Sequence, residues 1–203
     1  VESEVSGFMD GHRETAGALW SQSPDSGCSA PPGRTSTGHY VLSLAALSER
    51  GYVPGKLKPV EPTEAMLNAR LSAGDLLISR SNTQELVGFA GVFDEDREDV
   101  SFPDTMMRMH FDEERILKRF VEAVLLSSHG RLHMMQSAAG TSGSMKKINR
   151  RTLGQCILPV PPLEEQHRFL REVAGIRSVQ LRSQSTTSFT SAVKSALLMA
   201  VFG

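Results

Sequence analysis

The sequence predicts an α/β (α+β) domain with a mixed sheet, followed by a long C-terminal coiled-coil helix. The continuous apolar run Leu76-Leu77-Ile78 is typical of a central strand that is buried on both faces of a sheet. The stretch Met107–Phe111 alternates apolar with polar side chains, which indicates a second strand. Apolar residues at helical spacing then run from Leu163 to Ala200. We therefore expect a domain at residues 1–161 and a helix at residues 162–203.

The composition fits a compact domain and leaves the binding partner open. The chain has 203 residues, of which 39% are hydrophobic, and its formal net charge is −1. Residues 61–130 carry 14 acidic and 7 basic side chains, whereas residues 131–203 carry 3 acidic and 10 basic ones. A basic region beside an acidic one can bind a polyanion on one side only, although two solvated faces explain the same pattern.

No segment predicts a membrane span or a targeting signal. The longest apolar run, Ala196–Phe202, is far shorter than the roughly 20 residues that cross a bilayer, and the start of the chain lacks a signal-peptide pattern. Cys28 and Cys156 are far apart and have no metal-ligand spacing, which points to a reducing compartment. We therefore expect a cytoplasmic protein without membrane contact.

The first half of the domain has the pattern of short strands joined by turns. The Ser-, Pro- and Gly-rich segment 21–38 predicts a loop, residues 39–44 predict a strand and residues 64–71 predict a short helix. Gly74-Asp75 predicts a turn before the central strand, and residues 86–93 predict the next strand. The acidic segment that follows lacks the Gly and the bidentate Glu of a calcium loop, so it indicates a solvated hairpin loop.

The second half predicts helices and one further strand. Asp112 is expected to cap an amphipathic helix at residues 113–127, and a second helix is expected at residues 132–138. A basic segment follows, and the run Cys156-Ile157-Leu158 then predicts a buried strand. Prolines end that strand, and a helix begins at Leu163, because proline cannot continue a ladder but suits the first turn of a helix.

The sequence contains no pattern that indicates catalysis or a metal site. The phosphate-loop spacing, the G-x-S-x-G nucleophile elbow and paired metal-ligand histidines are all absent. The loop at residues 140–145 is rich in glycine and precedes two lysines, but its spacing does not fit nucleotide binding. We therefore expect no catalytic residue, no metal ligand and no cofactor bound to this chain.

Two sequence blocks resemble the DNA specificity subunits of type I restriction–modification systems. In that family a G-D-[IVL]-L-x-x-R-x-N-[ST] box precedes a segment like G-T-S-G-x-M-x-x-I and a signature like I-P-x-P-P-L-x-E-Q-x-R-I. The first box corresponds here to Gly74-Asp75-Leu76-Leu77-Ile78-Ser79-Arg80-Ser81-Asn82-Thr83, followed by Glu85-Leu86-Val87-Gly88. The second block corresponds to Gly140-Thr141-Ser142-Gly143, Met145, Ile148 and Leu158-Pro159-Val160-Pro161-Pro162-Leu163-Glu164-Glu165-Gln166-His167-Arg168-Phe169.

This resemblance implies a target-recognition domain with its spacer helix, and a function in sequence-specific DNA binding without catalysis. It implies as partners double-stranded DNA, methyltransferase subunits that bind S-adenosylmethionine, and in some complexes restriction subunits. Two alternatives remain open. The first is a specificity module that is joined to catalysis in a longer DNA-modifying enzyme, and the second is a protein–protein adaptor without DNA contact.

The candidate DNA contacts are basic and hydrogen-bonding side chains in loops and at strand ends. Lysine and arginine neutralise phosphates, Asn can read adenine and Arg can read guanine. The candidates are Arg34, His39, Arg80, Asn82, Thr83, Lys146, Lys147, Asn149, Arg150 and Arg151. Each group has a structural alternative, since polar residues at 79–83 can cap a turn and residues 150–154 can form a surface helix with solvated arginines.

The C-terminal helix is expected to pair with a second helix. Its Ser- and Thr-rich middle, residues 183–191, has weak helix propensity, so an isolated helix would fray, and two shorter helices are the alternative. An antiparallel coiled coil would cover its apolar stripe, which consists of Leu163, Leu170, Val173, Val179, Phe189, Val193 and Leu197. The resemblance implies that the partner helix comes from a second copy, in a homodimer, or from the other half of a longer specificity subunit.

Overall fold

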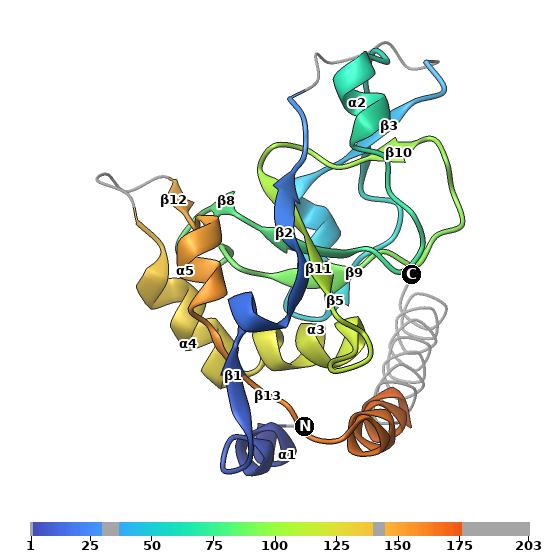
Figure 1. Cartoon of the computed structure of the whole chain (residues 1–203). Coiled ribbons are helices and arrows are strands. Elements are labelled where there is room, and N and C mark those ends of the chain that lie inside the picture. The colour runs from blue at the N-terminus through green and yellow to red at the C-terminus, as the bar shows by residue number, and fades with distance from the viewer. Residues whose placement is uncertain (1, 30–36, 140–144, 176–203) are drawn as a thin grey trace, which may run out of the picture. The chain divides into compact units, whose positions relative to one another are not determined.

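The computed structural model describes residues 2–29, 37–139 and 145–175 (Figure 1). The chain divides into two compact units, Val1–Gln166 and His167–Gly203. All strands of the described residues belong to the first unit. In the second unit the described residues, 167–175, are helical.

A four-stranded antiparallel sheet forms the centre of the first unit. Its order is β2–β11–β7–β9, with β2 at Trp20–Ser26, β11 at Met106–Phe111, β7 at Leu76–Ser79 and β9 at Ala90–Val92. Every residue of β7 is buried, because this strand lies between two others and both of its faces are covered. This confirms the central position that its apolar run predicts.

The remaining strands form one small mixed sheet and three short pairs among the described residues. β3 pairs antiparallel with β6 and parallel with β10. The sequence predicts a mixed sheet, and in the structure it is this smaller sheet that is mixed. The short pairs are β1 with β13, β4 with β5, and β12 with β8. The bounds of these strands are β1 Arg13–Thr15, β3 Tyr40–Leu42, β4 Leu47–Ser48, β5 Gly51–Tyr52, β6 Leu57–Pro59, β8 Ser81–Asn82, β10 Val100–Ser101, β12 Lys146–Lys147 and β13 Ile157–Pro159.

One helix packs against the central sheet, and further helices pack on that helix in turn. Helix α3 packs against β9 of the sheet and against α4, and α4 in turn contacts α5. The helices of the described part of this unit are α1 Glu2–Phe8, α2 Glu64–Asn68, α3 Lys118–Leu126, α4 Ser128–Ser137 and α5 Arg150–Gly154, with 3₁₀ turns η1 Ala16–Leu19 and η2 Leu44–Ala46.

The structure has strand β2 where the sequence predicts the start of a loop at residue 21, so that prediction is wrong for residues 21–26. Its sequence contains Ser, Pro and Asp, a composition typical of loops. β2 lies at the edge of the sheet and pairs with β11 alone, so Pro24 removes no ladder hydrogen bond from a second partner. An edge strand also needs few apolar side chains, so the composition of β2 does not distinguish it from a loop.

Helix α3 begins later than predicted, at Lys118 instead of residue 113. Asp112 does act as a cap, but only for a turn, since its Oδ1 accepts a hydrogen bond from the Glu114 N–H at 3.1 Å. The chain is extended again at Leu117, directly before α3. The predicted strand at residues 86–93 also shortens to β9, because residues 84–88 form a turn that ends at Gly88 with a φ of 79°.

Gln166 explains part of the P-P-L-x-E-Q signature. The side chain is fully buried, and its Oε1 accepts a hydrogen bond from the Leu117 N–H at 2.9 Å. Its Nε2 donates to the carbonyl oxygens of Arg115 at 3.0 Å and Pro161 at 2.8 Å. One amide therefore joins the turn before α3 to the segment after β13.

Cys156 is the small core residue that the sequence predicts. It is buried directly before β13, and burial raises the pKa of its thiol to about 12. The thiol therefore stays protonated at neutral pH. In β13 itself Leu158 and Pro159 are buried and Ile157 is exposed, so the predicted burial is confirmed except at Ile157.

Much of the predicted C-terminal helix lies outside the described residues. Residues 163–175 are helical, which confirms the predicted start. The candidates Val179, Phe189, Val193 and Leu197 lie outside the described ranges, as do Arg34 and the loop at 140–144. Within the described ranges, no helix combines the length and the apolar character that crossing a membrane requires.

Candidate nucleic-acid interface

The two sequence blocks meet in one short β-ribbon (Figure 1). β8 follows the central strand β7 and pairs antiparallel with β12, so that Lys146 lies opposite Asn82. The Ile148 N–H extends the pairing, since it donates to the Arg80 carbonyl oxygen at 2.8 Å. We refer to residues 80–83 and 145–148 as the β8–β12 ribbon. Its strands come from segments that are far apart in the sequence, yet each belongs to one of the two blocks.

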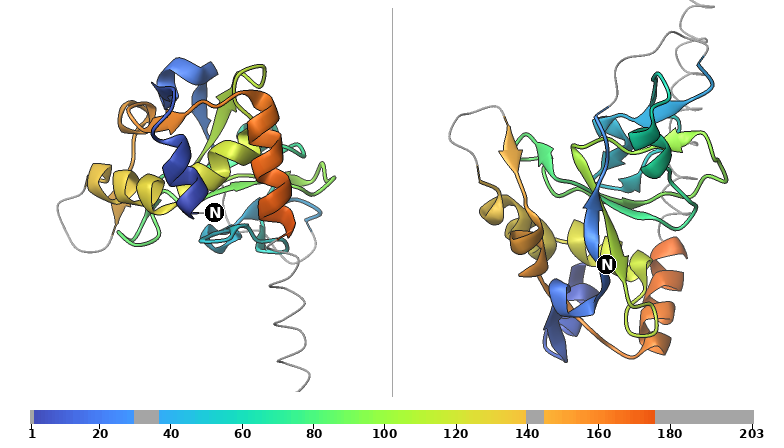
Figure 2. Two further views of the ribbon diagram at one scale, coloured as in Figure 1. Left: turned by 90° about the horizontal axis from the view of Figure 1, so that it is seen from below. Right: turned by 45° about the horizontal axis from the view of Figure 1, so that its top comes forward.

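Helix α5 places two arginines directly after the ribbon. Asn149 caps this helix, because its Oδ1 accepts a hydrogen bond from the Thr152 N–H at 2.9 Å. The Thr152 hydroxyl accepts in return from the Asn149 N–H at 3.2 Å, which completes a capping box. Arg150 and Arg151 are exposed on the first turn, and Figure 2 shows α5 beside α4 and next to β12.

The ribbon and α5 gather five cations. We refer to them as the basic cluster, which consists of Arg80, Lys146, Lys147, Arg150 and Arg151. Elsewhere in the first unit, Arg97, Arg108, Arg115 and Arg119 each form an ion pair with Asp or Glu. Within the described ranges, four members of the cluster form no such pair, namely Arg80, Lys147, Arg150 and Arg151. Their charge is therefore available to an external anion such as a phosphate.

Strand β2 holds two arginines of the cluster by one hydrogen bond each. The Arg80 guanidinium donates to the Ser26 Oγ at 3.0 Å. The Arg150 Nε donates to the Pro24 carbonyl oxygen. A guanidinium has five N–H donors, so most donors of both groups remain available.

Two of the candidate base readers have structural roles. The Asn82 Oδ1 accepts a hydrogen bond from the Thr83 N–H at 2.9 Å, and its Nδ2 donates to the Ser79 Oγ at 3.4 Å. A bidentate contact to adenine uses both amide atoms, so these bonds compete with base reading by Asn82. The cap at Asn149 competes in the same way through its Oδ1. Thr83 is exposed at the end of the ribbon.

Two further candidates are not placed in the cluster. His39 directly precedes β3 in the smaller sheet, and its N–H is bonded to the Thr37 hydroxyl at 3.3 Å. Arg34 lies outside the described residues. The structure therefore brings together eight of the ten candidates predicted from the sequence, at residues 80, 82, 83, 146, 147, 149, 150 and 151.

Sequence reasoning missed Arg131, which holds the loop between β8 and β9. Its guanidinium donates to the carbonyl oxygens of Val87 and Glu85, both at 2.8 Å, and lies 4.2 Å from the centre of the Phe89 ring. Burial lowers the pKa of Arg131. Gly88 turns in this loop with a φ of 79°, and a Cβ there would lie 2.5 Å from a side-chain atom of α4. In the sequence, the available signal for this turn was the Val87-Gly88 pair at the end of the first block.

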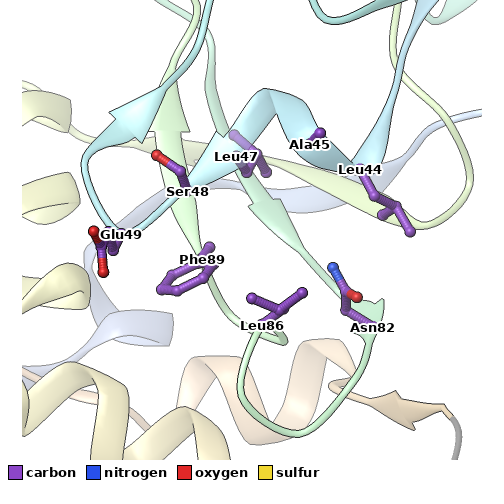
Figure 3. A pocket seen from close by; sticks show the side chains of 8 residues that line it. All are labelled: Leu44, Ala45, Leu47, Ser48, Glu49, Asn82, Leu86 and Phe89. Carbon is purple, nitrogen blue, oxygen red and sulfur yellow. The ribbon is translucent and has the colours of Figure 1, made fainter.

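An apolar pocket of about 490 Å³ lies beside the ribbon (Figure 3). Asn82 and Glu49 stand at its two ends in this view. The other lining side chains come from residues 44–48 and from the β8–β9 segment, namely Leu44, Ala45, Leu47, Ser48, Leu86 and Phe89. The lining contains no cation, so the pocket does not suit a phosphate. Within residues 2–29, 37–139 and 145–175, no three His, Cys, Asp or Glu side chains are grouped to hold a metal ion.

In sequence the chain is similar to a characterised specificity subunit. It is 27% identical over 150 residues to the type I restriction enzyme EcoKI specificity subunit of Escherichia coli K12. The match covers 72% of this chain and 32% of that subunit, so the chain spans about a third of the length of this curated relative. No protein-family model matches the chain.

Solved structures from type I restriction–modification systems share the fold. A chain from a structural description of complex assembly and conformational transition of the type I system matches with a TM-score of 0.64 at 18% identity, over 94% of this chain and 44% of that chain. The S subunit from M. genitalium matches with a TM-score of 0.53 at 11% identity, over 82% and 39%. The HsdS subunit from Thermoanaerobacter tengcongensis matches with a TM-score of 0.51 at 15% identity, over 82% and 37%. Sequence and fold together therefore confirm the resemblance of this chain to the DNA specificity subunits of type I restriction–modification systems.

Proposed function

We propose that this chain is a non-catalytic DNA target-recognition module that binds double-stranded DNA at a specific sequence. The observation that carries the proposal is the β8–β12 ribbon with α5. Beside its polar strand ends lie four cations that form no ion pair within the described ranges, namely Arg80, Lys147, Arg150 and Arg151. Phosphate contacts from such cations supply affinity and orientation, and base-edge contacts supply specificity. The similarity to the EcoKI specificity subunit supports the same function.

The proposal includes the partners of the module. It directs separate methyltransferase subunits, and in some complexes restriction subunits, to the bound site in the cytoplasm. S-adenosylmethionine binds to the methyltransferase subunits, whereas this chain binds no cofactor and no metal. The likeness to a chain from a type I restriction–modification complex supports the partnership with other subunits of such a system.

Methylome mapping tests the proposed function. In cells that carry the chain with its methyltransferase, we expect methylation at one defined motif, and we expect that motif to disappear when the chain is deleted. Methylation that continues at the same motif without the chain contradicts the proposal.

At least one of Arg34, His39, Arg80, Asn82 and Thr83 is expected to read a base, so its Ala variant should lose about 1–3 kcal/mol of discrimination and relax the motif. If every variant keeps the parental motif at full stringency, these side chains are structural.

The apolar pocket favours a second candidate function, that of a protein–protein adaptor. Leu86, which lines it, is 43% exposed, and the pocket offers an apolar side chain of a partner a place to bind. The two functions differ in how binding depends on salt. A DNA-binding module binds any duplex with an affinity that falls steeply as salt rises, whereas an adaptor binds no duplex at any salt concentration.

A further inference from the structure

Three consecutive residues of β2 contact basic side chains from three other segments. In Figure 1, β2 lies between β11 and α5. In all three contacts an arginine donates a hydrogen bond to the residue of β2, and one contact is also an ion pair. They are Pro24 to Arg150, Asp25 to Arg108, and Ser26 to Arg80.

The register of the sheet explains why Ser26 meets Arg80. Ser26 lies opposite Met107 on β11, and Met107 lies opposite Ile78 on β7. Directly paired residues on neighbouring strands point to the same face of a sheet, and so do residues two apart on one strand. Arg80 comes two residues after Ile78, so its side chain emerges on the face that carries the Ser26 hydroxyl.

Asp25 points to the other face and fixes the register. It lies opposite Arg108, whose guanidinium donates to the Asp25 Oδ2 at 2.9 Å and to the Asp75 Oδ2 at 3.0 Å. The Nε2 of His110 lies 2.6 Å from the Asp25 Oδ1. These bonds hold β2 where its ladder with β11 is irregular, between residues 108 and 110. A slip by one residue would exchange the faces of Asp25 and Ser26.

We propose that Pro24, Asp25 and Ser26 form a positioning segment for the DNA interface. Ser26 orients the Arg80 guanidinium, the Pro24 carbonyl orients that of Arg150, and Asp25 keeps both in register. This inference rests on the proposed function. An arginine that is already held by one bond loses less conformational freedom when it binds a phosphate, and its remaining donors can form charge-assisted bonds to the phosphate oxygens.

The test measures binding of the full chain to a random-sequence duplex over a range of NaCl concentrations. The variants are Ser26→Ala, Ser26→Thr, Arg80→Ala and the double variant S26A/R80A. Ser26→Ala removes one hydroxyl and is expected to weaken binding about fivefold. It should also reduce the salt slope by up to about one unit, the share of one phosphate contact. Ser26→Thr restores the hydroxyl and should restore both quantities.

The double variant separates positioning from a general effect on the fold. If Ser26 acts through Arg80, Ser26→Ala has no further effect in the Arg80→Ala background. Thr63→Ala is the matched control, because the Thr63 hydroxyl is also half-buried and also accepts one hydrogen bond, from the Met66 N–H at 3.3 Å, and lies outside the basic cluster and the pocket. This control should leave binding and the salt slope unchanged.

Three results would each contradict at least one of the two proposals. A chain that is folded by circular dichroism and binds no duplex overturns the proposed function, and the positioning role with it. A chain that binds duplex equally well with Ser or Ala at position 26 overturns the positioning role alone. Equal losses from Ser26→Ala in both backgrounds do the same, because the effect then does not pass through Arg80.

Discussion

At the scale of single residues, Asp25 shows how one carboxylate is held charged. Partial burial raises the pKa of Asp25, but the hydrogen bonds from Arg108 and His110 outweigh it. The net result is a pKa below the ordinary value of 3.8. The carboxylate therefore stays ionised over the whole neutral and mildly acidic pH range, where it bonds the side chains of Arg108 and His110 on β11.

This charge predicts how stability depends on pH. Because the pKa of Asp25 is lower in the folded than in the unfolded chain, its ionised form contributes stability above about pH 4, and the contribution disappears as the pH falls through the folded-state pKa. Denaturant unfolding of the parent and of Asp25→Asn over a pH series measures it. We expect the stability difference between them to be largest at mildly acidic and neutral pH and to shrink toward acid. A difference that stays constant into strong acid contradicts the prediction.

Gln166 supports a prediction about the fold. Its side chain is buried, and Gln166→Ala removes the partner of the Leu117 N–H and of two carbonyl oxygens. We expect a loss of about 3 kcal/mol in the free energy of unfolding. Gln22→Ala is the control, since Gln22 is exposed on β2, and it should change stability by less than about 0.5 kcal/mol.

At the scale of elements, the capping box of α5 connects the ribbon to two arginines of the cluster. Only residues 148 and 149 separate β12 from the helix. The direction of α5 therefore depends on Asn149, whose side chain replaces the missing helical acceptor of the Thr152 N–H. The same residue is a candidate base reader, and the two roles can be separated.

Substitutions at Asn149 distinguish a cap from a base contact. Asn149→Ala should cost about 1 kcal/mol of stability, whereas Asn149→Ser keeps a capping oxygen and should cost much less. If Asn149 serves only as the cap, Asn149→Ser retains the parental methylation motif. If it reads adenine, Asn149→Ser keeps stability and loses the motif, because serine cannot form the bidentate contact.

The lysines of β12 carry a prediction about affinity. Lys146 and Lys147 stand on the ribbon beside a strand end. Replacing both with Ala should weaken binding by a similar factor for all sequences and flatten the salt slope by up to about two units. Measuring binding to a random duplex and to the methylated motif at several salt concentrations checks this. An unchanged slope rules out both lysines as phosphate ligands.

The predictability of the elements followed the strength of their local patterns. β7 and β11 were predictable, because burial on defined faces imposes apolar runs and alternation on the sequence. β2 was not, because an edge strand that supplies a carbonyl and a hydroxyl to neighbouring arginines has the composition of a loop. The late start of α3 was hidden because its approach is held by Gln166, far away in the sequence.

At the scale of the whole molecule, the site was predictable as a set of residue types and unpredictable as an arrangement. The basic residues near position 150 and the polar end of β7 stood out from the sequence. Their pairing across the β8–β12 ribbon depends on tertiary contacts, which the local sequence pattern does not reveal. The resemblance placed both blocks in one family, and the structure shows that they are neighbours in space.

The helix that begins at residue 163 leads to a prediction about assembly. We expect the chain on its own to form a homodimer through antiparallel pairing of this helix, and to read a symmetric two-part site with a fixed gap. Charged substitutions at Val173 and Leu197 should split the dimer and leave the recognition domain folded. Analytical ultracentrifugation measures the mass. A monomer at tens of micromolar, with no longer chain to supply a second helix, contradicts the prediction.

The β8–β12 ribbon also bears on how the chain reaches its folded state. Ser81 and Met145, which are in contact, are separated by 64 positions. Closing so long a loop costs entropy before the contact forms, so strands of this kind join late in folding. Until they do, the edge of β8 has unpaired N–H and C=O groups beside apolar β7, and such an edge recruits strands from other chains. Synthesis that stalls before residue 145 should therefore yield aggregation-prone chains, and the onset of DNA binding should mark the last folding step.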